Sequence, residues 1–378
     1  MGLSRPLPEV VTDILTLEGA ILEKKNDACM EFLLPSSLAG ILGIPEHGTL
    51  SFSPLPSFEE TISASYESEL FRALERLFSG KGKMAMAAYP SFLPPTEKIS
   101  KWVSEKIALS NATFRLQKVE HQTVAYALIL FKYVALSDEK REGAFLLLVN
   151  ERNLSTLLLN DHSVEFLADL KNPKEAFTKS PEETRKAVQA GFASASAIVK
   201  EEFVPFIKSL ERRLNRDIKR VVEYYETLKA ETQKAFEKKT LLAGDSADEM
   251  PEVNQILSGK MDAIEGEKKG KIQDLISKYA LDVRIEPVSV IDIEAESLVF
   301  WLDIRRRLSS RLFPLIYNPL VRKIDPLPCE GCFYPRGGYY ICDEKLHILC
   351  ASCFKKCPSC ARQYCSACHP KGCPRCKN

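Results

Sequence analysis

The sequence lacks the long apolar runs that a membrane-spanning helix requires. None of its 378 residues belongs to a segment approaching the ~18 to 20 consecutive apolar residues of such a helix. The N-terminal 25 residues contain early acidic side chains and no long apolar stretch, unlike a secretory signal. We therefore expect a soluble, cytoplasmic protein without a membrane partner.

A charge excess of either sign is also missing. Lys and Arg together number 52 and Asp and Glu 51, which leaves a net charge of +1. No global field marks the chain as a nucleic-acid binder, so any such binding must come from local patches. The length, with 45% hydrophobic and 27% charged residues, favours two or three globular domains and excludes wholesale disorder.

Common catalytic motifs are absent. The GKGK stretch at 80–83 lacks the frame of a phosphate-binding loop, and neither a G-x-S-x-G elbow nor an H-E-x-x-H helix occurs. His47, His121 and His162 are scattered along the chain. We expect a protein without catalytic residues that is not an enzyme.

Cysteine is almost absent before residue 329, where only Cys29 occurs, and we expect that thiol to be buried. The other eleven cysteines all lie within 329–376. An odd number does not close a disulfide framework, and cytoplasmic thiols stay reduced. The cluster therefore indicates metal binding.

The spacing of the cluster defines six ligand pairs. Five are C-x2-C turns and the second is a Cys-x4-His pair, which gives twelve ligands, or three tetrahedral sites for about three structural zinc ions. His369 is surplus and is expected at the surface. In chain order the pairs are pair 1 (Cys329, Cys332), pair 2 (Cys342, His347), pair 3 (Cys350, Cys353), pair 4 (Cys357, Cys360), pair 5 (Cys365, Cys368) and pair 6 (Cys373, Cys376).

Two schemes join these pairs. The first eight ligands resemble the RING finger order, which implies pair 1 with pair 3 and pair 2 with pair 4, while the last four cysteines form a separate site. The gaps before His347 and before Cys357 depart from that order. The rival scheme joins pair 3 with pair 5, pair 4 with pair 6, and pair 1 with pair 2. Spacing alone does not choose between them.

Residues 1–175 read as a mixed α/β domain. Periodicity predicts a helix at 58–79, and β-rich composition predicts strands at 83–89, 112–119, 123–136 and 144–150. Short turns between the last three strands predict an antiparallel meander.

Residues 176–280 read as a helical hairpin, similar to a coiled coil. Ser180, Pro181 and Glu183 form a helix-start pattern, and an apolar stripe continues to about residue 242, with Pro205 as a site for a kink. A polar break at 242–251 precedes a second helix at 252–280, which should fold back on the first.

After residue 280 the hydrophobic pattern changes from a helical period to strict alternation. Segments 281–287, 288–294 and 297–304 alternate as strands, and 305–323 is basic without any acid. We assign 281–327 to a strand-rich connector and 328–378 to the zinc module, which gives a multidomain α+β fold. The four arginines at the start of the basic stretch suit either nucleic-acid phosphates or packing against the zinc module: Arg305, Arg306, Arg307 and Arg311.

The charge of the tail leaves two kinds of partner open. Residues 321–378 have a formal charge of +6, but three thiolate-bound zinc ions contribute about −5. A protein-binding surface and direct contact with DNA or RNA both remain candidates. For the latter, the aromatic residues Phe333, Tyr334, Tyr339 and Tyr340 are stacking candidates.

Three phrases add a family resemblance: GIPEHGTLSFS at 43–53, FLLLVNE at 145–151 and, after the charged hairpin, LDVRIEPVSVI at 281–291. In this order the segments resemble the C-terminal, non-motor region of RapA, the bacterial SWI/SNF-type ATPase family associated with RNA polymerase. The resemblance covers about residues 30–295. The motor lobes are missing and a RING-like or zinc-ribbon tail is added, so no catalytic residue transfers.

The resemblance implies an accessory subunit that works beside a separately encoded SWI/SNF-type ATPase. A stand-alone zinc-dependent nucleic-acid-binding protein and a RING-like ligase scaffold are the alternatives. Fold analogy alone does not decide among them.

Overall fold

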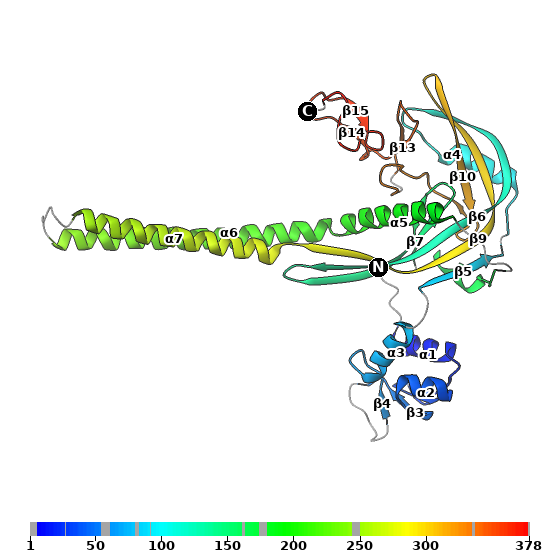
Figure 1. Cartoon of the computed structure of the whole chain (residues 1–378), viewed down its shortest axis with the longest axis horizontal. Helices are drawn as coiled ribbons and strands as arrows, with labels where there is room; N and C mark the ends of the chain where they lie inside the picture. Colours follow the sequence, from blue (N-terminus) through cyan, green and yellow to red (C-terminus); the bar gives the residue numbers. More distant parts are fainter. Residues whose placement is uncertain are drawn as a thin grey trace.

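The computed structural model is a mixed helix and strand protein with a cysteine-rich C-terminal region (Figure 1). It describes residues 6–26, 28–53, 61–79, 83–90, 92–160, 163–173, 180–243, 250–334 and 337–376. Within these ranges no helix is long and apolar enough to cross a membrane.

A small N-terminal unit forms its own core. Strands β1, β2 and β3 pair antiparallel, β4 pairs parallel with β3, and the buried side chains that cover this sheet all come from residues 11–77. The predicted helix at 58–79 begins only at Glu69, because 61–63 form a strand instead; 58–60 lie outside the described residues. The elements are α1 (Leu7–Leu17), β1 (Ile21–Lys24), β2 (Cys29–Leu33), α2 (Ser36–Leu42), β3 (His47–Ser51), β4 (Thr61–Ser63) and α3 (Glu69–Ser79).

The central sheet has the strand order β11-β10-β9-β6-β7-β8 in the described chain, with β5 parallel to β9. The pairs along this order are antiparallel, and β6 and β9 run beside each other over almost their full lengths. The elements are β5 (Met84–Tyr89), α4 (Thr96–Lys106), β6 (Thr113–Leu136), β7 (Lys140–Asn150), β8 (Thr156–Leu158), β9 (Asp282–Arg306), β10 (Ser309–Asn318) and β11 (Lys323–Ile324).

Two long strands replace five predicted short ones. The segments 112–119 and 123–136 are the single strand β6, and the three segments after 281 are the single strand β9. The predicted meander is wrong in its first link, because 112–119 and 123–136 form one strand that pairs with β9 on its other side, whereas the predicted antiparallel link between 123–136 and 144–150 is confirmed. Residues 120–122, between the two segments predicted before residue 137, continue the strand β6. Pro287 falls at a register shift, where a missing N–H is tolerated. The sheet therefore joins ranges that the sequence assigned to separate domains.

Helix α5 (Pro181–Glu202) covers one face of β6 and β7. Its Ala187 and Ala190 are buried against Ile129 and Val149. The predicted start is confirmed, because Ser180 and Glu183 form a reciprocal capping box and Pro181 is the first helical residue. The short 3-10 helix η2 (Glu165–Asp169) adds Phe166 to the core cluster on the other face.

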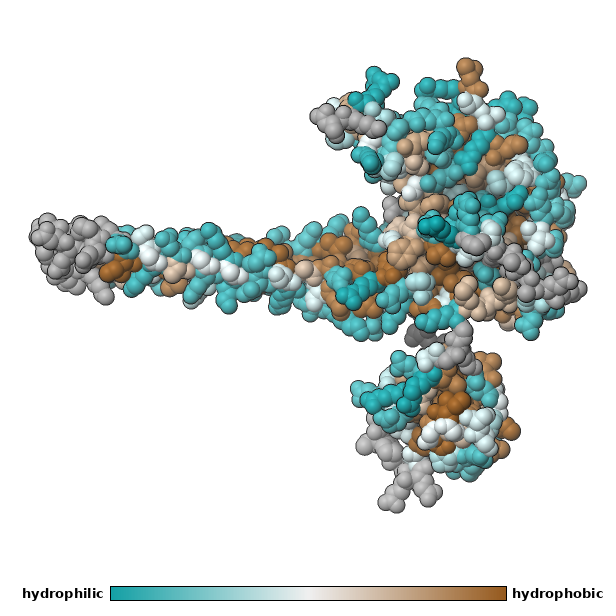
Figure 2. All heavy atoms as spheres, in the orientation of Figure 1, coloured by the Kyte–Doolittle hydropathy of each residue, from teal (hydrophilic) through white to brown (hydrophobic). Residues whose placement is uncertain are grey.

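Helices α6 (Val204–Ala243) and α7 (Met250–Tyr279) lie side by side and project from the sheet (Figure 1). The first predicted helix is divided at Phe203, two residues before Pro205. Lys229 and Lys268 donate to Glu265 across and along the helices, and these hydrogen bonds lower the pKa of Glu265 to about 2. Figure 2 shows apolar side chains gathered mainly over the part of these helices nearest the sheet. The predicted break at 242–251 lies largely outside the described residues.

The strands of the tail are short and are joined by turns in its described residues. Ile341 and Ile348 are fully buried in the same core cluster as Phe300 and Phe313 of the sheet. The tail is therefore packed onto the sheet through apolar contacts. Its strands are β12 (Tyr340–Ile341), β13 (Ile348–Leu349), β14 (Phe354–Lys356) and β15 (Gln363–Cys365).

Candidate metal centre

The structure gathers all twelve predicted ligands into three groups of four. Within each group every ligand atom lies within 4.8 Å of the others, so each group could hold a metal ion. Group I combines pairs 1 and 3 (Cys329, Cys332, Cys350, Cys353), group II combines pairs 2 and 5 (Cys342, His347, Cys365, Cys368), and group III combines pairs 4 and 6 (Cys357, Cys360, Cys373, Cys376).

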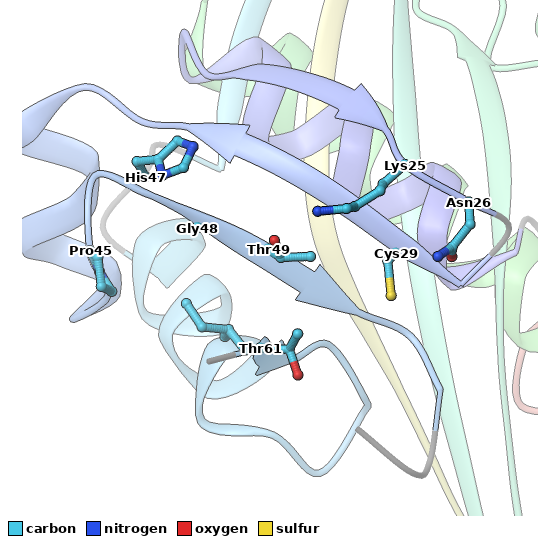
Figure 3. Close-up of a pocket in the computed structure, with 9 residues that line it drawn as sticks. Lys25, Asn26, Cys29, Pro45, His47, Gly48, Thr49 and Thr61 are labelled. Carbon is cyan, nitrogen blue, oxygen red and sulfur yellow. The ribbon is translucent and has the colours of Figure 1, made fainter. Parts of the chain in front are cut away.

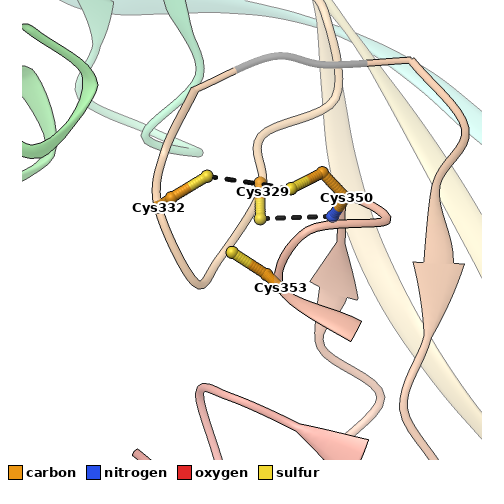
Figure 4. Close-up of side chains that lie close together, drawn as sticks. All are labelled: Cys329, Cys332, Cys350 and Cys353. Carbon is orange, nitrogen blue, oxygen red and sulfur yellow. Dashed lines mark hydrogen bonds between the residues drawn. The ribbon is translucent and has the colours of Figure 1, made fainter. Parts of the chain in front are cut away.

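Group I shows the geometry most clearly (Figure 4). Its four sulfur atoms point toward one another, and the Sγ atoms of Cys332 and Cys350 are 3.8 Å apart. Sulfur ligands at ~2.3 Å from a tetrahedral ion lie ~3.8 Å from each other. The group therefore has the dimensions of a complete four-sulfur site.

Tight turns make this geometry. In pair 1 the Cys332 and Phe333 amides both donate to the Cys329 carbonyl, and in pair 3 the Cys353 amide donates to Cys350. The Cys350 amide also donates to the Cys329 sulfur at 3.2 Å. Such N–H···S bonds favour the thiolate, which is the form that binds metal.

Group II includes the predicted histidine ligand. His347 Nδ1 lies 3.3 Å from the Cys368 sulfur and 3.6 Å from the Cys365 sulfur, and the sulfurs of Cys342 and Cys368 are 3.9 Å apart. His369 takes no part in the group and contacts Glu344 at 2.6 Å instead. Group II therefore has four ligands, with a histidine in place of one cysteine.

Group III is the most exposed. The sulfurs of Cys360 and Cys373 are 3.8 Å apart, and Cys357 is buried, but Cys376 is exposed. An ion there would be shielded by less protein than in the other two groups.

Neither predicted pairing scheme is wholly right. The pairs join as 1 with 3, 2 with 5, and 4 with 6, so the first link follows the RING-like scheme, the last follows the rival, and the middle link belongs to neither. The β14–β15 hairpin explains the difference. It places Phe354, next to pair 3, opposite Cys365 of pair 5 and leaves pair 4 in the connecting turn. Spacing alone contains no information about this hairpin.

Crowded sulfur atoms also explain why each group suits a cation. In group II a hydrogen bond from Cys365 lowers the pKa of Cys342 to about 4. The same hydrogen bond, together with burial, raises the pKa of Cys365. Several thiolates at this distance repel one another unless a positive ion lies between them.

The four predicted arginines face carboxylates. Arg311 forms an ion pair with Glu330 at 2.8 Å, and Arg306 and Arg307 contact Asp343 at 2.6 and 3.3 Å. Arg305 contacts Asp303 on its own strand at 2.6 Å. Three of the four thus face acids of the tail, which favours the interpretation that they pack against the metal module.

These contacts divide the charges of the tail. Of its four acids, Glu330 and Asp343 face sheet arginines, Glu344 faces His369, and Asp325 is buried. No acid follows Glu344. In the described part beyond it, the exposed cations take part in no ion pair: Lys345, Lys355, Lys356, Lys371, Arg362 and Arg375.

The aromatic candidates of the tail are partly buried. Phe333 and Tyr334 pack against the cluster beneath α5, and the Phe333 carbonyl accepts a hydrogen bond from Thr156 at 2.6 Å. Tyr339 packs against the sheet core, and Tyr340 stacks on Phe354 with ring centroids 5.3 Å apart. The contacts of Phe333, Tyr334 and Tyr339 anchor the tail to the sheet, whereas the Tyr340–Phe354 stack lies within the tail.

Sequence reasoning missed a buried carboxylate at the entry to the tail. Asp325 accepts hydrogen bonds from the Asn150 and Asn318 amides at 2.6 and 2.8 Å. Burial raises its pKa to about 6, and these hydrogen bonds oppose the shift. The only hint in the sequence is an acid set within an otherwise basic and apolar stretch.

The N-terminal unit contains a cavity of about 660 Å³ beside β2, β3 and β4 (Figure 3). Its ionisable lining residues are Lys25, Cys29 and His47, and Lys25 contacts Glu31 at 2.6 Å. Cys29 is buried, as expected. No cluster of catalytic groups is assembled among the described lining residues.

No family model matches this chain, and no curated protein matches its sequence. The function is therefore argued from the site itself.

Proposed function

We propose that this chain is a non-catalytic accessory protein in which three structural zinc ions fix a nucleic-acid-binding tail to a β-sheet scaffold. Zinc suits the sulfur-rich donor sets and the tetrahedral dimensions of groups I to III. Four protein ligands in each group leave no open position for a substrate or an activated water, which supports structural ions.

The observation on which the proposal depends is the division of charge in the tail. Each of its four acids has a partner, in sheet arginines, His369 or buried amides, whereas the charged residues beyond Glu344 are cations alone. Metal–thiolate centres are negative, so attraction for phosphates is local to the exposed cationic side chains. Exposed lysines and arginines without carboxylate partners are the groups that neutralise phosphates.

The proposed partner is a separately encoded SWI/SNF-type ATPase. The resemblance of the segment order to the non-motor region of the RapA family supports it, and the projecting α6–α7 pair offers a long surface for such a protein. The tail would then hold DNA or RNA for the motor.

Nucleic-acid binding is tested with two matched triple variants. Lys355→Ala, Lys356→Ala and Arg362→Ala remove tail cations, whereas Lys234→Ala, Lys238→Ala and Lys271→Ala remove exposed cations of α6 and α7. The first triple should lower affinity for a DNA duplex at 50 mM salt and reduce the salt slope by up to ~3, while the second should change neither. Equal binding by both triples would contradict the proposal.

The motor is tested by a tagged pull-down with nuclease treatment, read by mass spectrometry. Recovery of a SWI/SNF-type ATPase at comparable abundance supports the accessory role. Recovery of the chain alone, with binding to nucleic acid retained in vitro, would favour the stand-alone protein.

One observation favours a RING-like scaffold as a second candidate. Without pair 4, the remaining ligand pairs in chain order are 1, 2, 3 and 5. Group I joins the first of these with the third and group II joins the second with the fourth, which is the order of the RING resemblance. A ligase scaffold would accelerate discharge of ubiquitin-type protein from a conjugating enzyme of the same cell. No acceleration in that assay removes this candidate.

A further inference from the structure

Three cavities follow one another where α4 meets β10, β11 and the base of the tail. The middle cavity has a volume of about 530 Å³ and its neighbours about 300 and 310 Å³. Trp102 lines the middle cavity and one neighbour, and Arg322 lines the middle cavity and the other. Two shared residues therefore place the three cavities in a row, which we name the Trp102 groove. Its outer cavities also contain acids, Glu165 and Asp169 in one and Asp325 in the other, so the middle cavity is its most cationic part.

One face of α4 supplies much of the groove. Lys98, Lys101, Trp102 and Glu105 recur at helical spacing of three and four and all line the middle cavity. The opposite contacts of this helix are apolar, because Ile99 and Val103 belong to the sheet core. Trp102 lies at the edge between the two faces, because it packs against the sheet core and also lines the cavity.

The charged groups of the middle cavity are mostly positive and accessible. Lys98, Lys101 and Arg322 are exposed and take part in no ion pair in the described chain, and Glu105 is the one acid of its lining. Arg322 differs in this respect from Arg305, Arg306, Arg307 and Arg311, which all face carboxylates.

The aromatic groups are held in place. Trp102 is partly buried and packs against the sheet core, and Tyr317 is 5% exposed at the base of the cavity. Burial raises the pKa of the Tyr317 hydroxyl above its ordinary value of 10. A packed aromatic surface beside exposed cations suits a planar ring that carries a phosphate.

We propose that the Trp102 groove binds single-stranded nucleic acid, with a base against Trp102 and the adjoining phosphates near Lys98, Lys101 and Arg322. This inference rests on the proposed function and names the form of nucleic acid. A paired base inside a duplex cannot lay its face on a side chain in a cavity, whereas an unpaired base can.

The groove is continuous with the tail. Gly338 and Tyr339 of the tail line the cavity beside Trp102, and the Ser110 amide donates to the Tyr339 carbonyl at 2.8 Å. A strand bound in the groove therefore reaches the base of the metal module directly.

The two tryptophans of the chain allow a direct test. Trp301 lies on β9, where its ring N–H donates to Glu120 at 2.7 Å, so Trp301→Phe leaves Trp102 as the sole indole reporter. Titrating that zinc-loaded variant with dT10 should quench its fluorescence, with the same midpoint as binding of fluorescein-labelled dT10 measured by anisotropy. In the matched Trp102→Phe protein, the Trp301 emission should stay constant while dT10 still binds.

Affinity gives the second readout. Trp102→Ala should weaken dT10 binding about tenfold, Trp102→Phe less than threefold, and Lys98→Ala with Lys101→Ala about tenfold at low salt. The lysine variant lies on exposed positions and keeps the test valid if Trp102→Ala does not fold. Zinc content and circular dichroism check the fold of each variant.

The outcomes separate the two proposals. If labelled dT10 binds but Trp102 is not quenched and the lysine variant binds normally, the groove assignment is wrong while the nucleic-acid-binding tail stands. If only duplex binds, the groove is wrong in the same way. If neither probe binds, both proposals fail.

Discussion

Arg311 of β10 binds Glu330 of the tail through two hydrogen bonds, one from each terminal nitrogen, both 2.8 Å long. The same carboxylate accepts the Ile348 amide at 2.7 Å, and Arg311 also donates to the Leu346 carbonyl at 3.3 Å. The hydrogen bond to Glu330 raises the pKa of Arg311. One planar side chain thus links the sheet to pair 1 and to the strand before pair 3.

Replacing Arg311 should loosen the tail. Arg311→Ala leaves Glu330 partly buried without its charge partner, so we expect the zinc-loaded protein to lose about 2 kcal/mol of unfolding free energy in urea. Arg311→Lys should recover only part of this, because an ammonium group does not reproduce the two parallel bonds.

Arg307→Ala is the control for this contact. Its side chain is 74% exposed and meets Asp343 at 3.3 Å, so the expected loss is below ~0.5 kcal/mol. Equal losses for Arg307→Ala and Arg311→Ala would show that the paired hydrogen bonds add nothing.

Ligand substitutions should differ by group. Cys353→Ser should release about one zinc and unfold the module while residues 1–300 stay folded, because all four ligands of group I belong to the tail. Cys376→Ser, at the exposed edge of group III, should also release one zinc but leave groups I and II intact. Zinc content by mass spectrometry, with circular dichroism, checks both. Three retained equivalents in either protein would refute the ligand assignment.

Replacing Gly331 with alanine should disturb group I. A Cβ at this position would lie 3.0 Å from the Cβ and 3.1 Å from the Sγ of Cys353, so Gly331→Ala should push pairs 1 and 3 apart. We expect weaker zinc retention against a chelator for this variant. Gly337→Ala is the matched control, because nothing lies within 4 Å of its Cβ, and it should retain zinc normally.

Asp325 should make stability depend on pH. Its pKa of about 6 in the folded state exceeds the ordinary value of 3.8, so the folded protein holds the proton more tightly than the unfolded chain. The stabilisation is therefore complete below pH 4 and is lost as pH rises through 6, by about 3 kcal/mol in total.

The difference in unfolding free energy between wild type and Asp325→Asn isolates the titration of Asp325, because the titration of the metal ligands is common to both proteins. Between pH 4.5 and 7.5, urea unfolding should show wild type losing stability relative to the variant. A constant difference across this range would mean that Asp325 does not titrate there.

The metal ligands could be predicted because C-x2-C spacing is a local property of the chain, and the same holds for the cap formed by Ser180 and Glu183. The grouping of Cys342 with Cys365 could not be predicted, because it depends on the β14–β15 hairpin, in which Cys365 pairs with Phe354. The pairing of β6 with β9 escaped prediction for a similar reason. Neighbouring strands were expected from neighbouring sequence, whereas Leu136 pairs with Asp282.

That pairing also orders events during synthesis. After β6 leaves the ribosome, β7 is synthesised at once. The partner of Leu136 on the other side, Asp282, lies 146 residues further along the chain and is synthesised much later. Until then one edge of β6 exposes unpaired backbone groups, which is a hazard for association with other nascent chains. The helices α5, α6 and α7 are made in this interval. We expect α5, which covers the apolar face of β6 and β7, to shield the half-made sheet until β9 arrives.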